Sequence, residues 1–324
     1  MSSAEAEWLP VEKDLLAAAD IPAAGPVSAF RGSVVRDRGR RAWTEPLDRF
    51  PQNLFTVRVG GDVVVGRKLL SPLWQQGLIA EPYCSRVRAG HVLGVLDTFR
   101  SDSRAVSVFF HPFTEAERRG VIDVIARRPG TEIVFPFSKV YPEGEMLSPP
   151  QGWSLPAGRP DSLARGEELL REVSVGLVAG GSRPDPVVFD PACSTGDFLA
   201  AVKRGVPGAR TIGQDLSAEM AGHAASRVDE VHHADAAFPV LADGTADFVF
   251  CRFLNAEVVT TLQARRHLAR LSRVVAPGGV LVVFGHTPVL VTGAEIAASG
   301  LSLETCSASG GEGSVFQFYS ARRA

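Results

Sequence analysis

The chain has 324 residues, of which 45% are apolar and 22% charged, a balance that excludes disordered, collagen-like and small disulfide-stapled proteins. At roughly 100–200 residues per domain, this length suits one large domain or two modest ones. Lysine plus arginine number 34 and aspartate plus glutamate 36, a formal net charge of −2, so we expect no nucleic-acid partner, which would need a concentrated positive field.

The first 50 residues are expected to be peripheral. Residues 11–19 have the apolar spacing of one short helix, and Pro22 would end it. A basic run follows, made of Arg31, Arg36, Arg38, Arg40 and Arg41. We interpret this run as a solvated or self-paired surface segment; the alternative is a role in holding a carboxylate or phosphate.

The next part of the chain predicts a small mixed domain. Two β-rich runs, 54–59 and 62–65, flank Gly60-Gly61 and predict a hairpin. Residues 105–110 and 131–135 are predicted strands, and between them Thr114 and Glu117 form a capping box that opens a helix to about residue 127. Five prolines and three glycines fall within residues 142–160, where we place a domain boundary. The prediction is an N-terminal α+β domain over 1–150 and a second domain over 160–324.

From about residue 161, helices and strands alternate. Predicted helices cover 162–179, 196–203, 218–227 and 261–275, and predicted strands cover 187–189, 209–214, 231–233, 246–250 and 279–284. Residues 301–307 and 314–320 predict a final hairpin. This alternation indicates an α/β fold, with a doubly wound, mostly parallel, seven-stranded sheet and a terminal antiparallel hairpin.

The segment 187–198 is typical of a ligand site. An apolar strand ends in Asp190, a turn of small residues follows, and Gly196 leads into a helix. Small residues let the backbone approach a ligand, and a helix N-terminus offers N–H groups. Asp215 ends the next strand, where a carboxylate suits a ribose diol, and Asp235 follows the third, where one can accept from an adenine amine. Singly, such acids can instead cap the following helices.

On these residues, 165–324 resembles the class I S-adenosylmethionine-dependent methyltransferases. Residues 190–196 match the family's first motif, Asp215 its ribose-binding acid, Asp235 the acid near the adenine, and 276–279 the turn before the fifth strand. The resemblance implies that S-adenosylmethionine is the cofactor. It also implies a set of cofactor contacts, namely Asp190, Ala192, Cys193, Ser194, Gly196, Asp215, Leu216, Asp235, Ala236 and Phe253.

The first motif departs from the family's usual glycine-rich pattern. Ala192 and Ser194 stand where glycines are common, and Gly196 remains. We hypothesise that the Ser194 hydroxyl reaches the carboxylate or amine of the cofactor's methionine.

Two other nucleotide-site interpretations fit the residues less well. An NAD-type domain expects G-x-G-x-x-G after the first strand, and residues 190–196 lack it. Adenine-N6 DNA methyltransferases share a similar first motif, but they need an Asn/Asp-Pro-Pro-aromatic segment where this chain has residues 251–255. We therefore expect a small-molecule substrate.

The expected reaction is methyl transfer, in which the enzyme mostly aligns donor and acceptor. Candidates for an acceptor-side or catalytic role are Tyr141, Asn255 or Glu257, and His286. Each has an ordinary structural alternative, as a core or surface residue. In this family, additions such as residues 1–150 commonly cover the cofactor and form the substrate pocket as a lid.

A second reaction class stays open. In a closed aromatic pocket, the cofactor's own amine or α-carbon could attack its Cγ, releasing methylthioadenosine and azetidine-2-carboxylate or 1-aminocyclopropane-1-carboxylate. A few methyltransferase-like enzymes of natural-product pathways resemble this layout, with a long N-terminal part and a serine in the first motif. A third class is a non-catalytic binding protein with a degenerate site, against which the retained acids and Gly196 argue.

Cysteine usage and the N-terminus suggest a cytoplasmic protein. The four cysteines show no zinc spacing, so no metal is expected, and they indicate a reducing compartment. Residues 1–10 do not form a signal peptide, and no stretch approaches 18 uncharged apolar residues, so no membrane contact is expected. A homodimer is an open alternative to a monomer.

Overall fold

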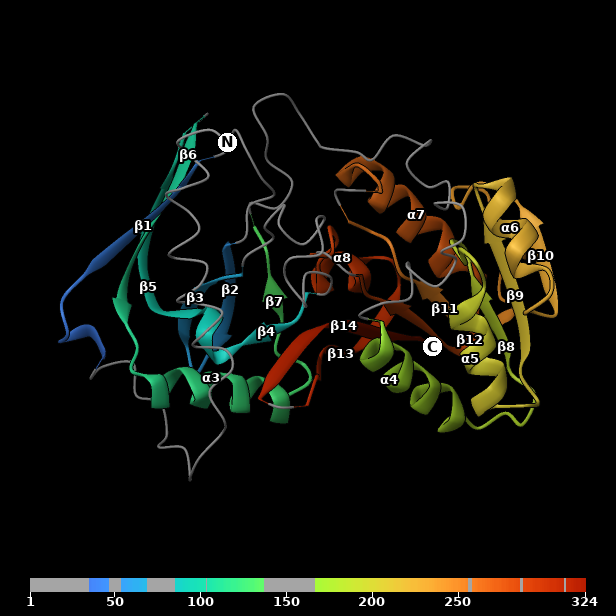
Figure 1. The fold of residues 1–324 in the computed structure, drawn as a ribbon, viewed down its shortest axis with the longest axis horizontal. Coiled ribbons are helices and arrows are strands. Elements are labelled where there is room, and N and C mark those ends of the chain that lie inside the picture. Colours follow the sequence, from blue (N-terminus) through green and yellow to red (C-terminus); the bar gives the residue numbers. More distant parts are fainter. Residues whose placement is uncertain are drawn as a thin grey trace. The chain divides into compact units, whose positions relative to one another are not determined.

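The computed structural model describes residues 35–46, 54–68, 85–102, 104–136, 167–255, 258–285, 288–311 and 313–324. The chain divides into two compact units (Figure 1). The first comprises Met1–Pro82, Arg86–Gly144 and Ser307–Gln317, and the second comprises Tyr83–Ser85, Glu145–Cys306 and Phe318–Ala324. The predicted boundary at 142–160 lies outside the described residues, so the domain division at that point stays a prediction.

The first unit is built on a six-stranded sheet in the order β1-β6-β5-β3-β2-β7, in which each neighbouring pair is antiparallel. Helix α3 (Glu115–Arg127) packs its apolar residues, among them Val121, Ile122 and Ile125, into a core with Phe55 and Val64. The strands are β1 (Arg41–Pro46), β2 (Leu54–Val59), β3 (Asp62–Arg67), β5 (Val92–Ser101), β6 (Ala105–Pro112) and β7 (Ile133–Val134).

Sequence patterns predicted the local elements of this unit better than its topology. The hairpin at 54–65 is confirmed, and so is the Thr114–Glu117 capping box that opens α3. The strand–helix–strand unit is only partly right, because β6 and β7 are separated in the sheet by β5, β3 and β2. Strands β1 and β5 were not predicted; β1 begins within the basic run, at Arg41.

The second unit has the predicted α/β architecture. Seven strands form the path β10-β9-β8-β11-β12-β14-β13, and β4 (Val87–Arg88) pairs with β14 off this path. The first five strands along the path are mutually parallel, and β14 is antiparallel to β12. The strands are β8 (Val187–Asp190), β9 (Arg210–Asp215), β10 (Glu230–His233), β11 (Ala246–Cys251), β12 (Val275–Val283), β13 (Leu301–Ser309) and β14 (Ser314–Arg323).

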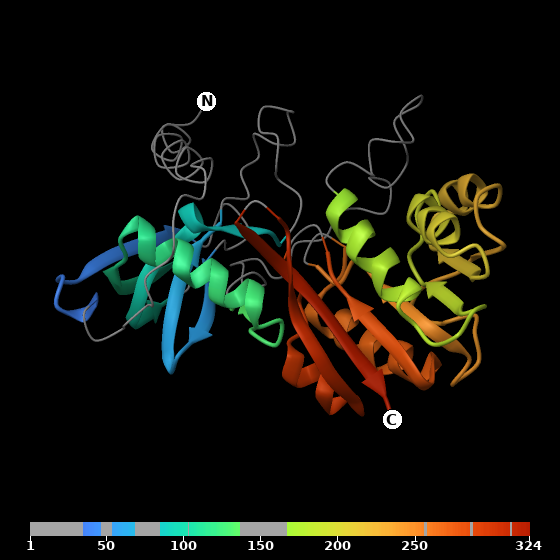
Figure 2. The same cartoon turned by 90° about the horizontal axis from the view of Figure 1, so that it is seen from below.

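Helices cover both faces of this sheet, with α4, α5 and α6 on one side and α7 and α8 on the other (Figure 2). The central strands can be almost wholly apolar because both faces are covered, and every residue of β11 is buried. Helix α8 was not predicted, and the predicted turn at 276–279 lies within β12. The helices are α4 (Glu168–Ala179), α5 (Asp197–Gly205), α6 (Ala218–Ala224), α7 (Thr261–Val274) and α8 (Gly293–Ala298).

The C-terminal hairpin contributes residues to both units. Its segment Ser307–Gln317 belongs to the first unit, where the Gln317 side chain donates to the Ile133 carbonyl oxygen at 2.9 Å. The Ser307 backbone N–H donates to the Pro129 carbonyl oxygen, also at 2.9 Å. The predicted division into 1–150 and 160–324 assigns these residues to the second domain.

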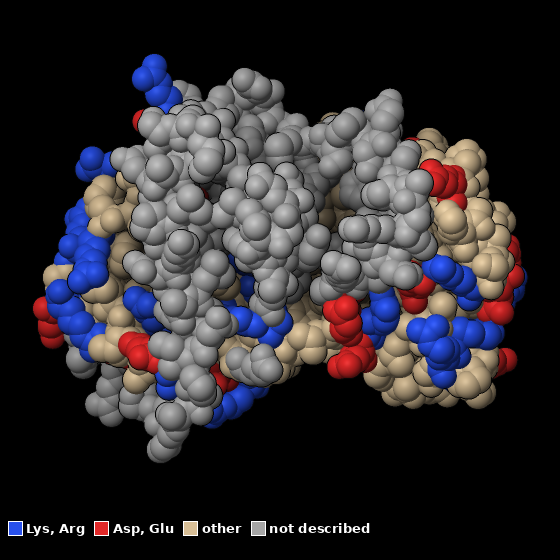
Figure 3. All heavy atoms as spheres, viewed as in Figure 1, with Lys and Arg blue, Asp and Glu red and all other residues tan. Residues whose placement is uncertain are grey.

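Charges of both signs occur on the face shown in Figure 3. Ion pairs between side chains that are largely exposed include Arg273–Asp243 at 2.6 Å and Arg322–Glu304 at 2.6 Å. Among the helices that the structure describes, none is long and apolar enough to cross a membrane.

The buried side chain of His91 is expected to make the folded protein less stable in acid. It lies at the end of the short 3-10 helix η1 (Ala89–His91), where its Nδ1 accepts from the Arg88 backbone N–H at 3.1 Å. Burial lowers its pKa to about 3, helped by four nearby positive charges, those of Lys68, Arg88, Arg67 and Arg86. Below pH 6.5 the unfolded chain binds a proton here that the folded chain excludes, so stability falls with decreasing pH.

This group alone should lower the free energy of unfolding by about 2 kcal/mol between pH 7 and pH 5. Urea unfolding of the wild type and of His91→Gln at both pH values would measure it. The variant should lose less stability on acidification, and an equal loss in both proteins would refute the assignment.

Candidate cofactor site

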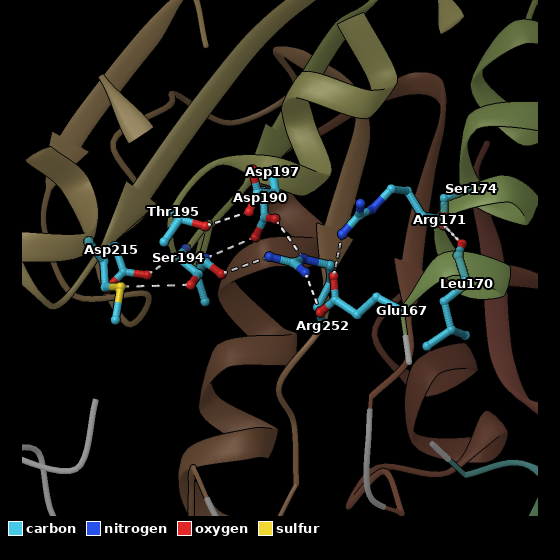
Figure 4. A network of polar contacts seen from close by, with 12 residues as sticks. Glu167, Leu170, Arg171, Ser174, Asp190, Ser194, Thr195, Asp197, Asp215 and Arg252 are labelled. Carbon is cyan, nitrogen blue, oxygen red and sulfur yellow. Dashed lines mark hydrogen bonds and ion pairs between the residues drawn. The ribbon is translucent and has the colours of Figure 1, made fainter. Parts of the chain in front are cut away.

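The carboxyl edge of the parallel strands in the second unit carries a series of polar contacts (Figure 4). At its centre, Asp190 ends β8 with a fully buried side chain. Its Oδ1 accepts from the Ala192 backbone N–H at 3.0 Å, and its Oδ2 accepts from Nε of Arg252 at 2.7 Å. Burial raises the pKa of Asp190, and the Arg252 charge opposes that rise.

Arg252 donates hydrogen bonds to three of the groups in this series. Its side chain is only 3% exposed, and besides Asp190 it donates from Nη1 to Glu167 at 3.0 Å and from Nη2 to the Ala192 carbonyl oxygen at 3.3 Å. Its guanidinium lies 4.7 Å from the Phe198 ring centroid and 4.8 Å from that of Phe253. Burial by itself lowers the pKa of Arg252, but the two carboxylates raise it above its ordinary value, so the group stays charged.

The β8–α5 loop, residues 191–196, wraps back on itself through two left-handed residues. Ser194 has φ +51° and is the one non-glycine residue with positive φ in the described parts of the chain; Gly196 has φ +81°. A Cβ at Gly196 would lie 3.0 Å from the Ala224 Cβ, so both conformation and packing favour glycine there. Ser194 also lies in the left-handed region, which glycine adopts more readily than serine.

Several backbone N–H groups of this loop donate hydrogen bonds to other groups of the protein. The backbone N–H of Cys193 donates to the Gln214 carbonyl oxygen at 2.9 Å, and that of Gly196 to the Cys193 carbonyl oxygen at 2.9 Å. These two groups are therefore not available to a ligand, and the predicted contribution of the helix N-terminus concerns the N–H groups from Asp197 onward. The thiol of Cys193 is buried, and burial raises its pKa, which makes it a packing group rather than a nucleophile.

Asp215 joins this loop to the end of the next strand. Its Oδ2 accepts from the Ser194 backbone N–H and its Oδ1 from the Ser217 backbone N–H, both at 2.8 Å. Burial raises its pKa, and these two hydrogen bonds counteract the shift. The helix-capping interpretation is thus partly right, because Asp215 bonds the residue that caps α6, and it also holds the β8–α5 loop.

The third predicted acid and its neighbours lie farther out along the edge. Asp235 is exposed, and its Oδ1 accepts from the Ala237 backbone N–H at 2.8 Å. Its carbonyl oxygen accepts from the Gln214 side chain at 2.8 Å, which ties it to β9. Leu216 is 64% exposed and Ala236 is half-buried. The roles of Leu216, Asp235 and Ala236 at a cofactor stay predictions.

Of the three catalytic candidates, the structure describes Asn255. Asn255 is buried, and its carbonyl oxygen accepts from the backbone N–H groups of Val258 and Val259, each at 3.0 Å. Tyr141 and His286 lie outside the described residues, as does Glu257, so their roles stay predictions. Phe253, predicted at the cofactor, packs against Arg252. The described residues hold no group of three potential metal-ligating side chains.

Sequence reasoning missed Arg252 and Glu167. A signal for Arg252 was present, because a charged residue directly follows the apolar run 248–251 at the end of β11 and a buried cation requires a counter-charge. Its partners were not readable, since Glu167 and Asp190 are 85 and 62 residues away in the chain.

Comparison with known proteins identifies the family. Residues 188–279 match the family model described as a methyltransferase domain. The chain is 36% identical over 280 residues to isonocardicin synthase of Nocardia uniformis subsp. tsuyamanensis, an alignment covering 84% of this chain and 92% of that protein. The chain belongs to the class I S-adenosylmethionine-dependent methyltransferase superfamily, in the same family as isonocardicin synthase. This chain is an S-adenosylmethionine-dependent enzyme.

Solved structures with a similar fold include magnesium protoporphyrin IX methyltransferase from Synechocystis PCC 6803 with bound SAM, at 19% identity and a TM-score of 0.40. That match covers 53% of this chain and 86% of the other. A SAM-dependent methyltransferase from Aquifex aeolicus matches at 18% identity and a TM-score of 0.40, covering 53% of this chain and 100% of its own.

Ser194 provides a first test of the site. If its hydroxyl bonds the methionine end of the cofactor, Ser194→Ala should weaken S-adenosylmethionine binding by about 1 kcal/mol, roughly fivefold. Ser194→Gly also removes the hydroxyl but relieves the positive φ. Calorimetric titration of both variants should show losses of affinity, whereas wild-type affinity in either variant would disprove a ligand role for the hydroxyl.

Proposed function

We propose that this enzyme transfers the methyl group of S-adenosylmethionine to a small organic acceptor in the making of a natural product. The observation that supports it best is the ordered series at the sheet edge: Asp190 with the β8–α5 loop, Asp215 on the next strand and Asp235 beyond the third. The relative's name, isonocardicin synthase, is that of an enzyme that makes a small molecule. A cytoplasmic location and a homodimer are further parts of this proposal.

When bound, S-adenosylmethionine supplies a sulfonium that activates both its methyl carbon and its methionine Cγ toward displacement. The chain's contribution is to fix the ends of this ligand, with Asp215 on the ribose and the β8–α5 loop beside the methionine. Such alignment carries much of the rate in a displacement reaction. A hydroxyl or amine acceptor also gives up a proton; Tyr141 and His286 remain our candidates for receiving it, and Asn255 remains a candidate for orienting the acceptor by a hydrogen bond.

Cyclisation at Cγ is the second candidate, and Arg252 is the observation that favours it. The carboxylate of Asp190 is already paired with the guanidinium at 2.7 Å. Because Arg252 pairs with it, this carboxylate stabilises a nearby ammonium group less than an unpaired aspartate would, so the amine's neutral, nucleophilic form is less disfavoured. The same environment also serves attack at Cγ by an external nucleophile.

Product analysis separates these reactions. The purified protein is incubated with S-adenosylmethionine alone, then with candidate phenols, amines and amino acids, and each mixture is examined by mass spectrometry. S-adenosylhomocysteine formed only with an acceptor supports methyl transfer. Methylthioadenosine with a cyclic amino acid, formed without an acceptor, establishes cyclisation instead, and methylthioadenosine formed only with an acceptor establishes transfer of the aminocarboxypropyl group.

A further inference from the structure

The order of the strands sets the direction in which an elongated ligand lies on this edge. Along the sheet the order is β10, β9, β8, β11. Asp235 follows β10, Asp215 ends β9, Asp190 ends β8 and Arg252 follows β11. A ligand whose adenine and ribose lie toward Asp235 and Asp215 must extend its remaining end over the β8–α5 loop, toward Arg252.

We propose that Arg252 is a positioning residue for the methionine end of S-adenosylmethionine, acting through Asp190 and the β8–α5 loop. This inference rests on the proposed function, because it takes the adenosine to lie at Asp215 and Asp235. Arg252 is buried, so it works through the groups it holds. Its role is distinct from that of Asp215, which lies on the ribose side of the same loop.

The contacts of Arg252 hold the loop at its start. One N–H of the guanidinium bonds Asp190, the last residue of β8, and another bonds the Ala192 carbonyl oxygen two residues later. Asp190 in turn accepts from the Ala192 backbone N–H, so the three residues close a small hydrogen-bonded ring. This ring fixes the start of the loop that leads to Cys193 and Ser194, whose backbone N–H groups are then held by Gln214 and Asp215.

A second set of contacts prevents the guanidinium from moving. Glu167, directly before α4, accepts from Nη1, and the other oxygen of Glu167 pairs with Arg171 at 3.3 Å. The rings of Phe198 and Phe253 flank the guanidinium. A planar group with several donors suits this arrangement, and a lysine ammonium cannot satisfy all three acceptors in the same geometry. Arg252→Lys should therefore keep the charge but loosen the loop.

The test compares two ligands that share the adenosine but differ at the methionine end. S-adenosylhomocysteine carries the amino acid, and methylthioadenosine lacks it. Calorimetric titration of Arg252→Lys should show S-adenosylhomocysteine binding weakened at least tenfold, with methylthioadenosine binding within twofold of wild type. Asp215→Asn is the control, and it should weaken both ligands to a similar extent because both carry the ribose diol.

Glu167→Gln is a second test variant. It keeps a hydrogen-bonding side chain but removes the charge that attracts Arg252. It should show the same ligand selectivity with a smaller loss, at a melting temperature close to that of the wild type. Equal losses for both ligands in Arg252→Lys, or none for either, would overturn the positioning role. A wild-type chain that binds neither S-adenosylmethionine nor S-adenosylhomocysteine would instead overturn the proposed function, and this inference with it.

Discussion

Replacing Arg252 with methionine is expected to lower the free energy of unfolding of the second unit by about 3–5 kcal/mol. The substitution keeps much of the side-chain volume but leaves the carboxylates of Asp190 and Glu167 buried without the guanidinium that both contact. Uncompensated buried charge is costly because the interior solvates it poorly. The loss should appear in urea unfolding followed by circular dichroism.

A matched substitution at the surface provides the control. Arg265 also pairs with a carboxylate, that of Glu295 at 2.7 Å, but its side chain is 54% exposed. Arg265→Met should cost at most about 1 kcal/mol, as surface ion pairs generally do. If the two variants unfold at the same urea concentration, the ion pairs of Arg252 with Asp190 and Glu167 do not stabilise the fold.

Replacing Asp215 with alanine is expected to weaken S-adenosylmethionine binding by about 3 kcal/mol, roughly a hundredfold, because two hydroxyls would lose hydrogen bonds to a charged acceptor. The carboxylate is held in place by the backbone N–H groups of Ser194 and Ser217, at 2.8 Å each. Burial raises the pKa of Asp215, so keeping its carboxylate ionised in the folded protein costs free energy. Such a cost at a strand end is typical of a binding group.

Equilibrium dialysis with labelled S-adenosylmethionine would measure the effect. Asp243→Ala serves as the control, since Asp243 is an exposed carboxylate paired with Arg273 and should leave binding unchanged. Retention of wild-type affinity by Asp215→Ala would place the ribose elsewhere and remove the main support for the direction of the ligand along the edge.

Much of the second unit could be predicted because its signals are local. Alternating apolar runs and turns predicted the five parallel strands, and the helix after Gly196 followed from the small-residue turn. In the first unit, the capping box at Thr114 predicted the start of α3 for the same reason, since its partners are three residues apart. Local hydrogen bonding leaves a pattern that spacing can reveal.

The elements that were missed depend on distant partners. Strand β1 carries two charged residues and was interpreted as surface, yet Glu45 on it forms a buried ion pair with Arg67 on β3. The contribution of Ser307–Gln317 to the first unit likewise depends on partners such as Ile133, 184 residues away from Gln317. A local pattern of residue types does not indicate which distant backbone group a strand will pair with.

By itself, the sequence determined the class of fold, the identity of the cofactor and the acids that follow successive strands, because each of these leaves a short-range pattern of residue types. Only the tertiary structure decided how the acids are used. It paired Asp190 with Arg252 and Glu167, and it bound Asp215 to the loop at Ser194. Charge burial is the physical reason, since the cost of desolvating an acid is set by which partners the fold brings to it.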